Sequence, residues 1–155
     1  MALREQFSKH LTEAMKAKHA KRLSTLRLVL ASLKELDIAK RDGTNTAGAS
    51  DAEILTLLAK MIKQREESAA TYDSGGRPEL AAGEREEIEI IREYMPKQMS
   101  ETEVKAEAVK AIAETGAASM KDMGRVMAVL KERFAGQMDF ARTSALVKEL
   151  LSAPK

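Results

Sequence analysis

Residues 63–99 read KQREESAATYDSGGRPELAAGEREEIEIIREYMPKQM, and this stretch determines how the chain is divided. It begins as a polar helix, stops at a pair of glycines, restarts near Pro78 and is broken again at Pro96. Because a residue that precedes proline avoids the helical conformation, the second helix is expected to end near Tyr94. The break at Pro96 therefore predicts two helical parts of unequal length.

Apolar residues elsewhere recur at three- and four-residue steps, which is the pattern of amphipathic helices. The sequences SDAE at 50–53 and SETE at 100–103 are capping boxes, which mark helix starts. Asp139 is a further candidate cap. At about 1.5 Å per residue the helix after Ser50 is long enough for its far end to project beyond the core. These signals predict seven helices, at about residues 3–17, 20–40, 51–74, 78–94, 100–116, 121–136 and 140–151.

The composition favours packed helices over sheets. Apolar residues make up 44% of the chain but aromatic residues only 3%, so Leu, Ile, Val, Ala and Met must fill the core. No alternating strand pattern is present in the sequence. We therefore predict an all-α protein with a four-helix bundle-like domain at 1–95, a linker at 96–99 and a small three-helix domain at 100–155.

Several classes of site are excluded by composition. The chain has no Cys, which removes disulfides, thiolate zinc sites and a Cys nucleophile. His10 and His19 are nine positions apart, so they are predicted to be solvent-exposed and not to form a metal pair. No catalytic residues, metal or cofactor are expected. Without a long apolar run or an apolar leader at Met1, we expect a cytoplasmic protein with no membrane contact.

Charge is distributed unevenly along the chain. Residues 1–41 hold ten Lys and Arg against four Asp and Glu, a balance of +6, whereas residues 42–99 hold seven against twelve, a balance of −5. Residues 100–155 are near neutral, with nine against eight. Either the basic and acidic segments attract each other inside one bundle, or the basic segment is free to bind phosphates.

Three clusters of polar residues are candidates for function. Glu86, Glu89 and Glu93 share a helix face, and nearby arginines favour a solvent-exposed, salt-bridged surface over a cation site. Arg65, Ser68 and Tyr72 lie on adjacent turns without a histidine to serve as base, so a contact surface is favoured over a nucleophile. This candidate partner-binding surface comprises Gln64, Arg65, Ser68, Tyr72 and Arg77.

The third cluster is KDMGR at 121–125, where a helix start is flanked by Lys121 and Arg125. A helix N-terminus offers free amides, and Gly124 would let another chain approach closely. This arrangement suits one backbone phosphate. The alternative is that Asp122 caps the helix itself and Gly124 packs against the helix at 100–116.

The chain resembles the GatB/YqeY family over nearly its whole length. The resemblance is carried by an ordered set of blocks: Ala14 to Ala17, Leu26-Arg27, Lys63 to Ser68, Tyr72, Gly76-Arg77, Leu80-Ala81, Glu84, Glu87-Ile88, Tyr94 to Met99, and Asp122 to Met127. It implies an N-terminal helical bundle joined to a three-helix domain, in agreement with the helix pattern.

The resemblance also implies a function. In the B subunit of the tRNA-dependent amidotransferase, a carbon–nitrogen ligase with glutamine as nitrogen donor, the similar region is an appendage that contacts tRNA. The catalytic cradle lies in another domain, to which this chain has no counterpart. We therefore expect a tRNA-binding module without its own catalysis or, alternatively, an adaptor that binds an amidotransferase or another protein. The expected RNA contacts are Lys121, Gly124, Arg125, Lys16, Lys18, Lys21 and Arg22.

Overall fold

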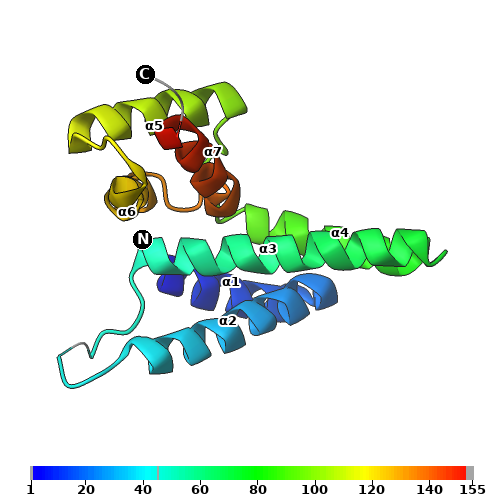
Figure 1. The fold of residues 1–155 in the computed structure, drawn as a ribbon. Coiled ribbons are helices and arrows are strands. Elements are labelled where there is room, and N and C mark those ends of the chain that lie inside the picture. Colours follow the sequence, from blue (N-terminus) through cyan, green and yellow to red (C-terminus); the bar gives the residue numbers. More distant parts are fainter. Residues whose placement is uncertain (1, 45, 153–155) are drawn as a thin grey trace. The chain divides into compact units, whose positions relative to one another are not determined.

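The computed structural model of the chain describes residues 2–44 and 46–152 (Figure 1). All regular structure in these residues is helical, without any strand, so the predicted all-α class is confirmed. The elements are α1 (Leu3–Ala17), α2 (Ala20–Lys40), α3 (Asp51–Ser74), α4 (Pro78–Arg92), α5 (Glu101–Thr115), a 3₁₀ turn η1 (Met120–Asp122), α6 (Met123–Arg133) and α7 (Phe140–Ser152).

Contacts group the chain into two compact units, residues 1–95 with α1 to α4 and residues 96–155 with α5 to α7. The segment predicted as a linker is hydrogen-bonded within the second unit. The Gln98 side-chain amide donates to the Gly136 carbonyl at 2.6 Å, and the Met99 N–H donates to the Gln137 carbonyl at 2.9 Å. These bonds hold the chain before α5 against the loop that follows α6.

Most predicted helix ends agree with the structure, and two differ for local reasons. Helix α4 ends at Arg92 instead of Tyr94, because the Tyr94 N–H bonds back only three residues, to the Ile91 carbonyl, as the chain approaches Pro96. Helix α6 ends at Arg133, before the predicted Gly136, because the residues after it turn away to bond with 98–99.

The caps explain where two other helices start. Ser50 and Glu53 form the predicted reciprocal capping box of α3. At α5 only half of the box is made: the Ser100 hydroxyl accepts the Glu103 N–H at 3.1 Å, while the Glu103 carboxylate meets the hydroxyl itself. Asp139 accepts the Ala141 N–H at 2.9 Å at the start of α7, as predicted.

The core of the first unit is built where the four helices meet. Phe7, Leu26, Ile54, Leu58 and Ile91 are fully buried there. A tight turn at residues 18–19 joins α1 to α2, so the two helices run side by side in opposite directions (Figure 1).

Helices α3 and α4 form a hairpin that extends past α1 and α2 (Figure 1). Its distal half is closed by small residues, since Ala69 and Ala81 are the buried side chains there.

The prediction that both histidines are exposed is wrong for His10. Its Nδ1 lies 2.6 Å from the Tyr94 hydroxyl, and its ring stacks at a tilt on the Tyr94 ring at 5.5 Å. Tyr94 is itself buried edge-on against Phe7, and this burial raises the pKa of its hydroxyl. His10 therefore completes the core of the first unit by giving the buried hydroxyl a partner, whereas His19 is exposed.

The second unit has a smaller core of its own. Ala108 and Ala111 of α5, Val126 and Leu130 of α6 and Val147 of α7 are buried together. Two alanines in this core let α5 approach its neighbours closely. The outer face of α6 is left in solvent.

Candidate functional site

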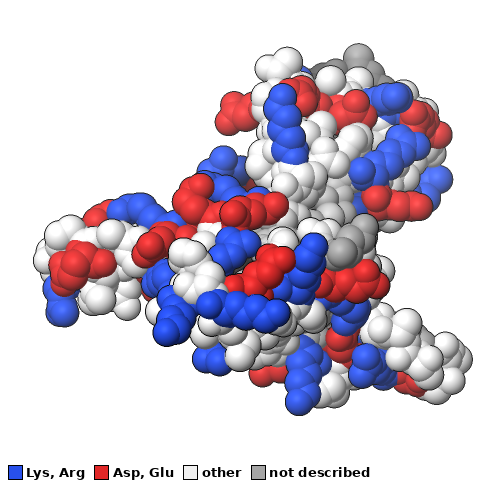
Figure 2. Space-filling view, turned by 180° about the vertical axis from the view of Figure 1, so that it is seen from behind, with Lys and Arg blue, Asp and Glu red and all other residues white. Residues whose placement is uncertain are grey.

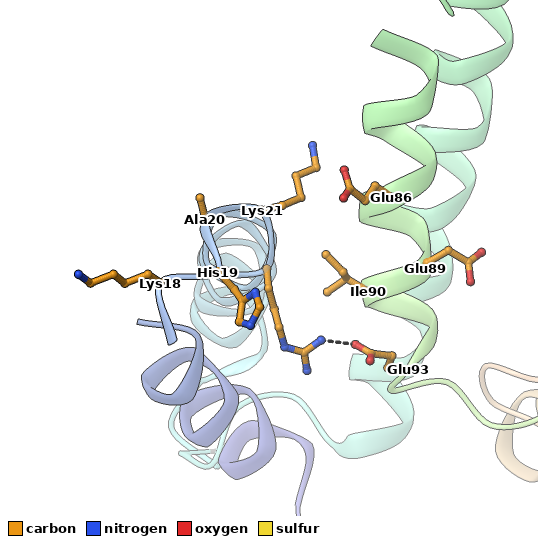
Figure 3. Close-up of a pocket in the computed structure, with 9 residues that line it drawn as sticks. Lys18, His19, Ala20, Lys21, Glu86, Glu89, Ile90 and Glu93 are labelled. Carbon is orange, nitrogen blue, oxygen red and sulfur yellow. Dashed lines mark hydrogen bonds and ion pairs between the residues drawn. The ribbon is translucent and has the colours of Figure 1, made fainter. Parts of the chain in front are cut away.

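Two of the cations at the α1–α2 turn, Lys21 and Arg22, lie close to carboxylates of the acidic helix α4 and the residue that follows it. Lys21 lies 3.4 Å from a carboxylate oxygen of Glu87. Arg22 forms an ion pair with Glu93, which is the dashed line in Figure 3. The hydrogen bond to Glu93 raises the pKa of Arg22. An open hollow of about 470 Å³ separates the two elements. The charge pattern left two alternatives for the basic segment. Lys21 and Arg22 follow the first of them, because they attract acidic residues within the bundle.

Lys16 and Lys18, the other two members of the predicted basic cluster, are exposed and make no ion pair within the described part of the chain. Lys18 extends away from α4 (Figure 3). The cluster is thus divided between two cations that stabilise the bundle and two that face solvent. Basic and acidic side chains are interspersed over the face of the molecule that Figure 2 shows.

The KDMGR segment differs from the second alternative considered for it, in which Asp122 caps α6 and Gly124 packs against α5. The Asp122 carboxylate accepts the N–H of Ala118 at 3.0 Å and that of Ser119 at 3.4 Å, so it caps the 3₁₀ turn before α6 and not α6 itself. The pKa of Asp122 is lowered, chiefly by the Ala118 bond and then by Arg125. Arg125 lies 2.5 Å from Asp122 but keeps 62% of its side chain exposed.

Gly124 does not pack against α5, which corrects that alternative. A Cβ at this position would meet nothing within 4 Å. Lys121 of η1 and Arg125, Ala128 and Lys131 of α6 are exposed beside it, and together these five residues form what we call the α6 face. The exposed Glu132, seven residues after Arg125, adds one negative charge on the same side of the helix. Lys131 was missed from sequence, although its seven-residue distance from Gly124 places it on the same side of the helix.

The candidate partner-binding residues lie in three places. Gln64, Ser68 and Tyr72 share one face of α3, where with two neighbours they outline an open hollow of about 430 Å³. Arg65 does not line this hollow, and its role in partner binding stays a prediction. Its side chain is only 13% exposed and donates to Glu87 at 2.9 Å and to the Met61 carbonyl at 3.1 Å.

Arg77, the last of these candidates, lies at the hairpin turn between α3 and α4 and pairs with Glu79 at 3.1 Å. Of the acidic cluster on α4, Glu89 pairs with Arg92 and Glu93 with Arg22, as expected for a salt-bridged surface. Arg85 instead pairs with Asp73 of α3. In residues 2–44 and 46–152, no three His, Asp or Glu side chains gather closely enough to hold a metal ion.

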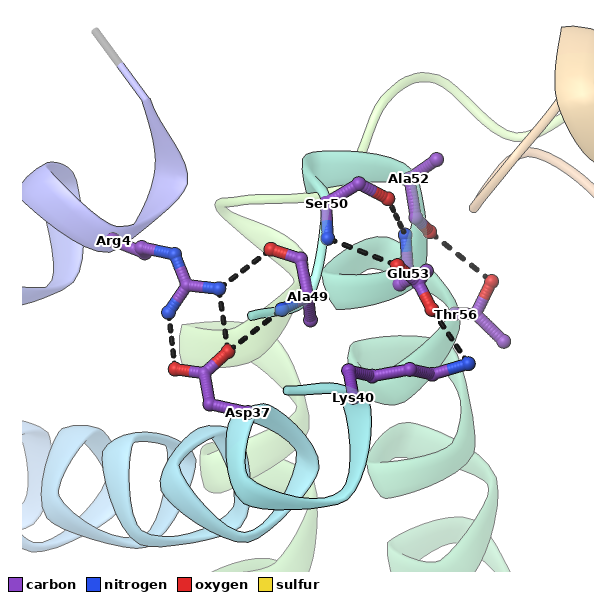
Figure 4. Close-up of polar contacts among 8 residues, drawn as sticks. All are labelled: Arg4, Asp37, Lys40, Ala49, Ser50, Ala52, Glu53 and Thr56. Atoms are coloured by element: carbon purple, nitrogen blue, oxygen red, sulfur yellow. Dashed lines mark hydrogen bonds and ion pairs between the residues drawn. The ribbon is translucent and has the colours of Figure 1, made fainter. Parts of the chain in front are cut away.

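A partly buried ion pair that sequence analysis missed connects α1, α2 and the loop before α3 (Figure 4). Arg4 donates to both carboxylate oxygens of Asp37 and to the Ala49 carbonyl, and the Ala49 N–H donates to Asp37 at 2.9 Å. The bond from Arg4 lowers the pKa of Asp37, against the opposing effect of burial. Asp37 follows Leu33 by four residues and so lies on the apolar stripe of α2. A charged residue on an apolar stripe was the signal from which this ion pair could have been predicted.

No helix among the described residues is long and apolar enough to cross a membrane. The sequence matches the family described as Yqey-like protein over residues 4–151. It is also 34% identical over 94 residues to a protein of Clavispora lusitaniae named altered inheritance of mitochondria protein 41, mitochondrial, a match that covers 61% of this chain and 52% of that protein.

Two further relatives match a similar share of this chain. A protein of the same name from Meyerozyma guilliermondii is 36% identical over 87 residues, covering 55% of this chain and 42% of that protein. An uncharacterized protein of Schizosaccharomyces pombe is 26% identical over 92 residues, covering 59% and 71%. The chain spans about half the length of the first of these relatives.

The word mitochondrial in two of these names belongs to those proteins, and the cytoplasmic location of this chain stays a prediction. The family match, in contrast, extends from the first turn of α1 to the last turn of α7. The chain therefore belongs to the YqeY-like protein family.

Proposed function

We propose that this chain is a tRNA-binding helical module, and that its second unit contacts RNA phosphates through the α6 face. The observation that carries the proposal is the arrangement of Lys121, Arg125 and Lys131 around Gly124 and Ala128 on one exposed side of a helix. Cations supply the attraction for phosphates, and the two small residues leave room for a nucleic-acid backbone to approach.

The dimensions of this surface suit several phosphate contacts. Ten residues separate Lys121 from Lys131, which corresponds to about 15 Å along a helix. The ion pair between Arg125 and Asp122 does not prevent binding, because exposed pairs of this kind are weak and a phosphate can replace the carboxylate. Lys16 and Lys18, which are exposed in the first unit, are additional candidate contacts.

The resemblance to the amidotransferase appendage supports tRNA as the nucleic acid. Under this proposal the amidation chemistry belongs to a separate carbon–nitrogen ligase, and this chain contributes affinity and orientation. Phosphate contacts would provide most of the binding energy, so the affinity should depend strongly on salt.

The proposal is tested by anisotropy of fluorescently labelled tRNA titrated with the full chain. Reversing two charges of the α6 face, in Lys121→Glu with Lys131→Glu, should weaken binding at least about tenfold and make the salt dependence shallower by about two contacts. Gly124→Leu should weaken binding without a change of charge, since its side chain would occupy the opening over the helix.

The matched control reverses two exposed lysines away from the α6 face, Lys110 of α5 and Lys148 of α7, which also make no ion pair in the described residues. This control changes net charge by the same amount and should retain most of the affinity. Equal losses in the control and in the α6 variant would show that net charge alone governs binding, and the proposed surface would be wrong.

A second candidate function is a protein adaptor that uses the exposed face of α3. The observation that favours it is the open hollow outlined by Gln64, Glu67, Ser68, Thr71 and Tyr72 on the projecting hairpin. Tyr72 is half-buried there, and its hydroxyl makes no hydrogen bond within the described residues. A partly buried tyrosine with a free hydroxyl is a common anchor at protein interfaces.

A further inference from the structure

The outer face of α2 carries a row of cations that the bundle does not use. Arg27, Lys34 and Arg41 are seven residues apart, so they lie on one side of the helix and its C-terminal cap. None of them forms an ion pair in the part of the chain that the structure describes. This distinguishes them from Lys21 and Arg22 of the same helix, which are held by α4.

Apolar side chains lie between these cations. Ala31 is exposed, and Ile38 exposes 64% of its surface, a large fraction for an isoleucine. Leu30, which lies between Arg27 and Lys34 in the chain, is partly buried. The row therefore alternates charged and apolar side chains along about 21 Å of helix.

Part of this row borders a groove between α1 and α2, while Arg27 lies beyond its lining. The groove is lined by Arg4 and Ser8 of α1 and by Leu30, Lys34, Ile38 and Arg41 on the α2 side, and its volume is about 340 Å³. We call this the α1–α2 groove. The carboxylate in it, Asp37, is already bonded by Arg4 and the Ala49 amide, so the charge left available at the groove is positive.

We propose that the α1–α2 groove binds an acidic amphipathic helix of a partner protein. A helix laid along α2 would present a carboxylate every seventh residue to Arg27, Lys34 and Arg41, and apolar side chains between them to Leu30 and Ile38. Three cations at this spacing match a helix of about four to five turns. The charges would set the register, and the apolar contacts would supply the burial.

Two other anionic occupants fit the face less well. A nucleic-acid backbone would pair with the cations but would leave Ile38 and Leu30 without an apolar partner. An anionic membrane needs a continuous apolar face with cations at its margins, whereas here the cations stand inside the row. A protein helix is the class that satisfies both kinds of side chain at once.

The probe is a fluorescein-labelled helical peptide of about 18 residues with Glu at every seventh position and Leu at the third and fourth positions after each Glu. Its affinity for the full chain is measured by anisotropy, beside a scrambled peptide of the same composition. We expect Lys34→Glu and Ile38→Ser each to weaken the acidic helix about tenfold, equivalent to about 1.4 kcal/mol.

Each variant has a matched control outside the groove. Lys60→Glu reverses an exposed lysine of α3, and Leu28→Ser removes an apolar side chain that is 46% exposed on another side of α2. Both controls should bind the acidic peptide as the unchanged chain does. Circular dichroism of all four variants separates loss of binding from loss of folding.

The proposal is overturned if the scrambled peptide binds equally well, or if the groove variants and their controls behave alike. Two further arms use vesicles of phosphatidylglycerol and phosphatidylcholine, and single-stranded RNA. Binding to either that depends on both Lys34 and Ile38, without binding of the acidic peptide, would assign the face to a membrane or to RNA. Self-association lost in Lys34→Glu would assign it to a second copy of the chain.

The outcome is independent of the proposed RNA function. The groove belongs to the first unit and the α6 face to the second, and the two sets of variants share no residue.

Discussion

At the scale of single residues, Asp37 joins three segments of the first unit through one carboxylate. Because the bond from Arg4 lowers its pKa, the folded chain binds fewer protons than the unfolded chain just below the ordinary Asp pKa of about 3.9. The stabilisation is therefore fully present above that pH and is lost as the pH falls through the lowered value. The ion pair predicts acid-sensitive stability.

Replacing Asp37 by Asn tests this prediction. Loss of the charge-assisted bonds from Arg4 should lower the free energy of unfolding by about 2 kcal/mol at pH 7. It should also flatten the decline of stability as the pH falls below about 4. Urea unfolding followed by circular dichroism at several pH values measures both effects, with the exposed Glu35→Gln on the same helix as control. An unchanged acid decline in Asp37→Asn would refute this assignment.

Gly48 provides a second test at this scale. Its φ is +86°, and a Cβ there would lie 2.5 Å from an oxygen of Asp37. Gly48→Ala should therefore cost about 2 kcal/mol or more in unfolding free energy, from the left-handed backbone and the displaced carboxylate. The matched control is Gly43→Ala in the same loop, where a Cβ meets nothing within 4 Å. If thermal denaturation shows both variants equally stable, the loop is not packed on Asp37 as described.

At the scale of secondary structure, the helix starts and ends were predicted from capping residues and from helix-breaking prolines and glycines. Ser50 and Asp139 mark helix starts through bonds to nearby amides, and such local interactions are readable from a short window of sequence. The early end of α6 was not predictable in this way, because it depends on bonds to residues 98–99, far away in the chain.

The candidate site was predicted less completely than the helices, for a related reason. Helical spacing placed Ser68 and Tyr72 on adjacent turns of α3, and both line the same hollow. The same spacing cannot tell which neighbour a long cation will pair with. Arg65 turned out to bond Glu87 of α4, and Lys21 to lie near the same carboxylate, because three helices meet there.

The adaptor hypothesis is tested on the α3–α4 hairpin. Tyr72→Ala and Gln64→Ala should abolish copurification of a defined partner with the full chain. Gln64→Ala should leave the free energy of unfolding within about 0.5 kcal/mol, since Gln64 is exposed. Arg65→Ala should instead destabilise the first unit, because it leaves Glu87 without its best hydrogen bond. A partner that survives both surface changes would remove the hypothesis.

At the scale of the whole molecule, the chain consists of two compact helical units that differ in how their charged side chains are paired and exposed. In the first unit two of the four cations at the α1–α2 turn are paired with α4, and a further row of cations lies on α2. In the second unit three exposed cations lie on the α6 face, and others, such as Lys110 and Lys148, lie on α5 and α7. The overall net charge of +2 conceals both surfaces, which explains why charge counts alone indicated so little about binding.

The most direct test of the central claim is the affinity of the full chain for tRNA measured from about 50 to 300 mM salt. If three cations of the α6 face contact phosphates, the logarithm of the affinity should fall with the logarithm of the salt concentration with a slope of about −2 to −3. The slope should become shallower by about two in Lys121→Glu with Lys131→Glu. Absence of binding even at the lowest salt, or a slope that the paired variant leaves unchanged, would contradict the claim.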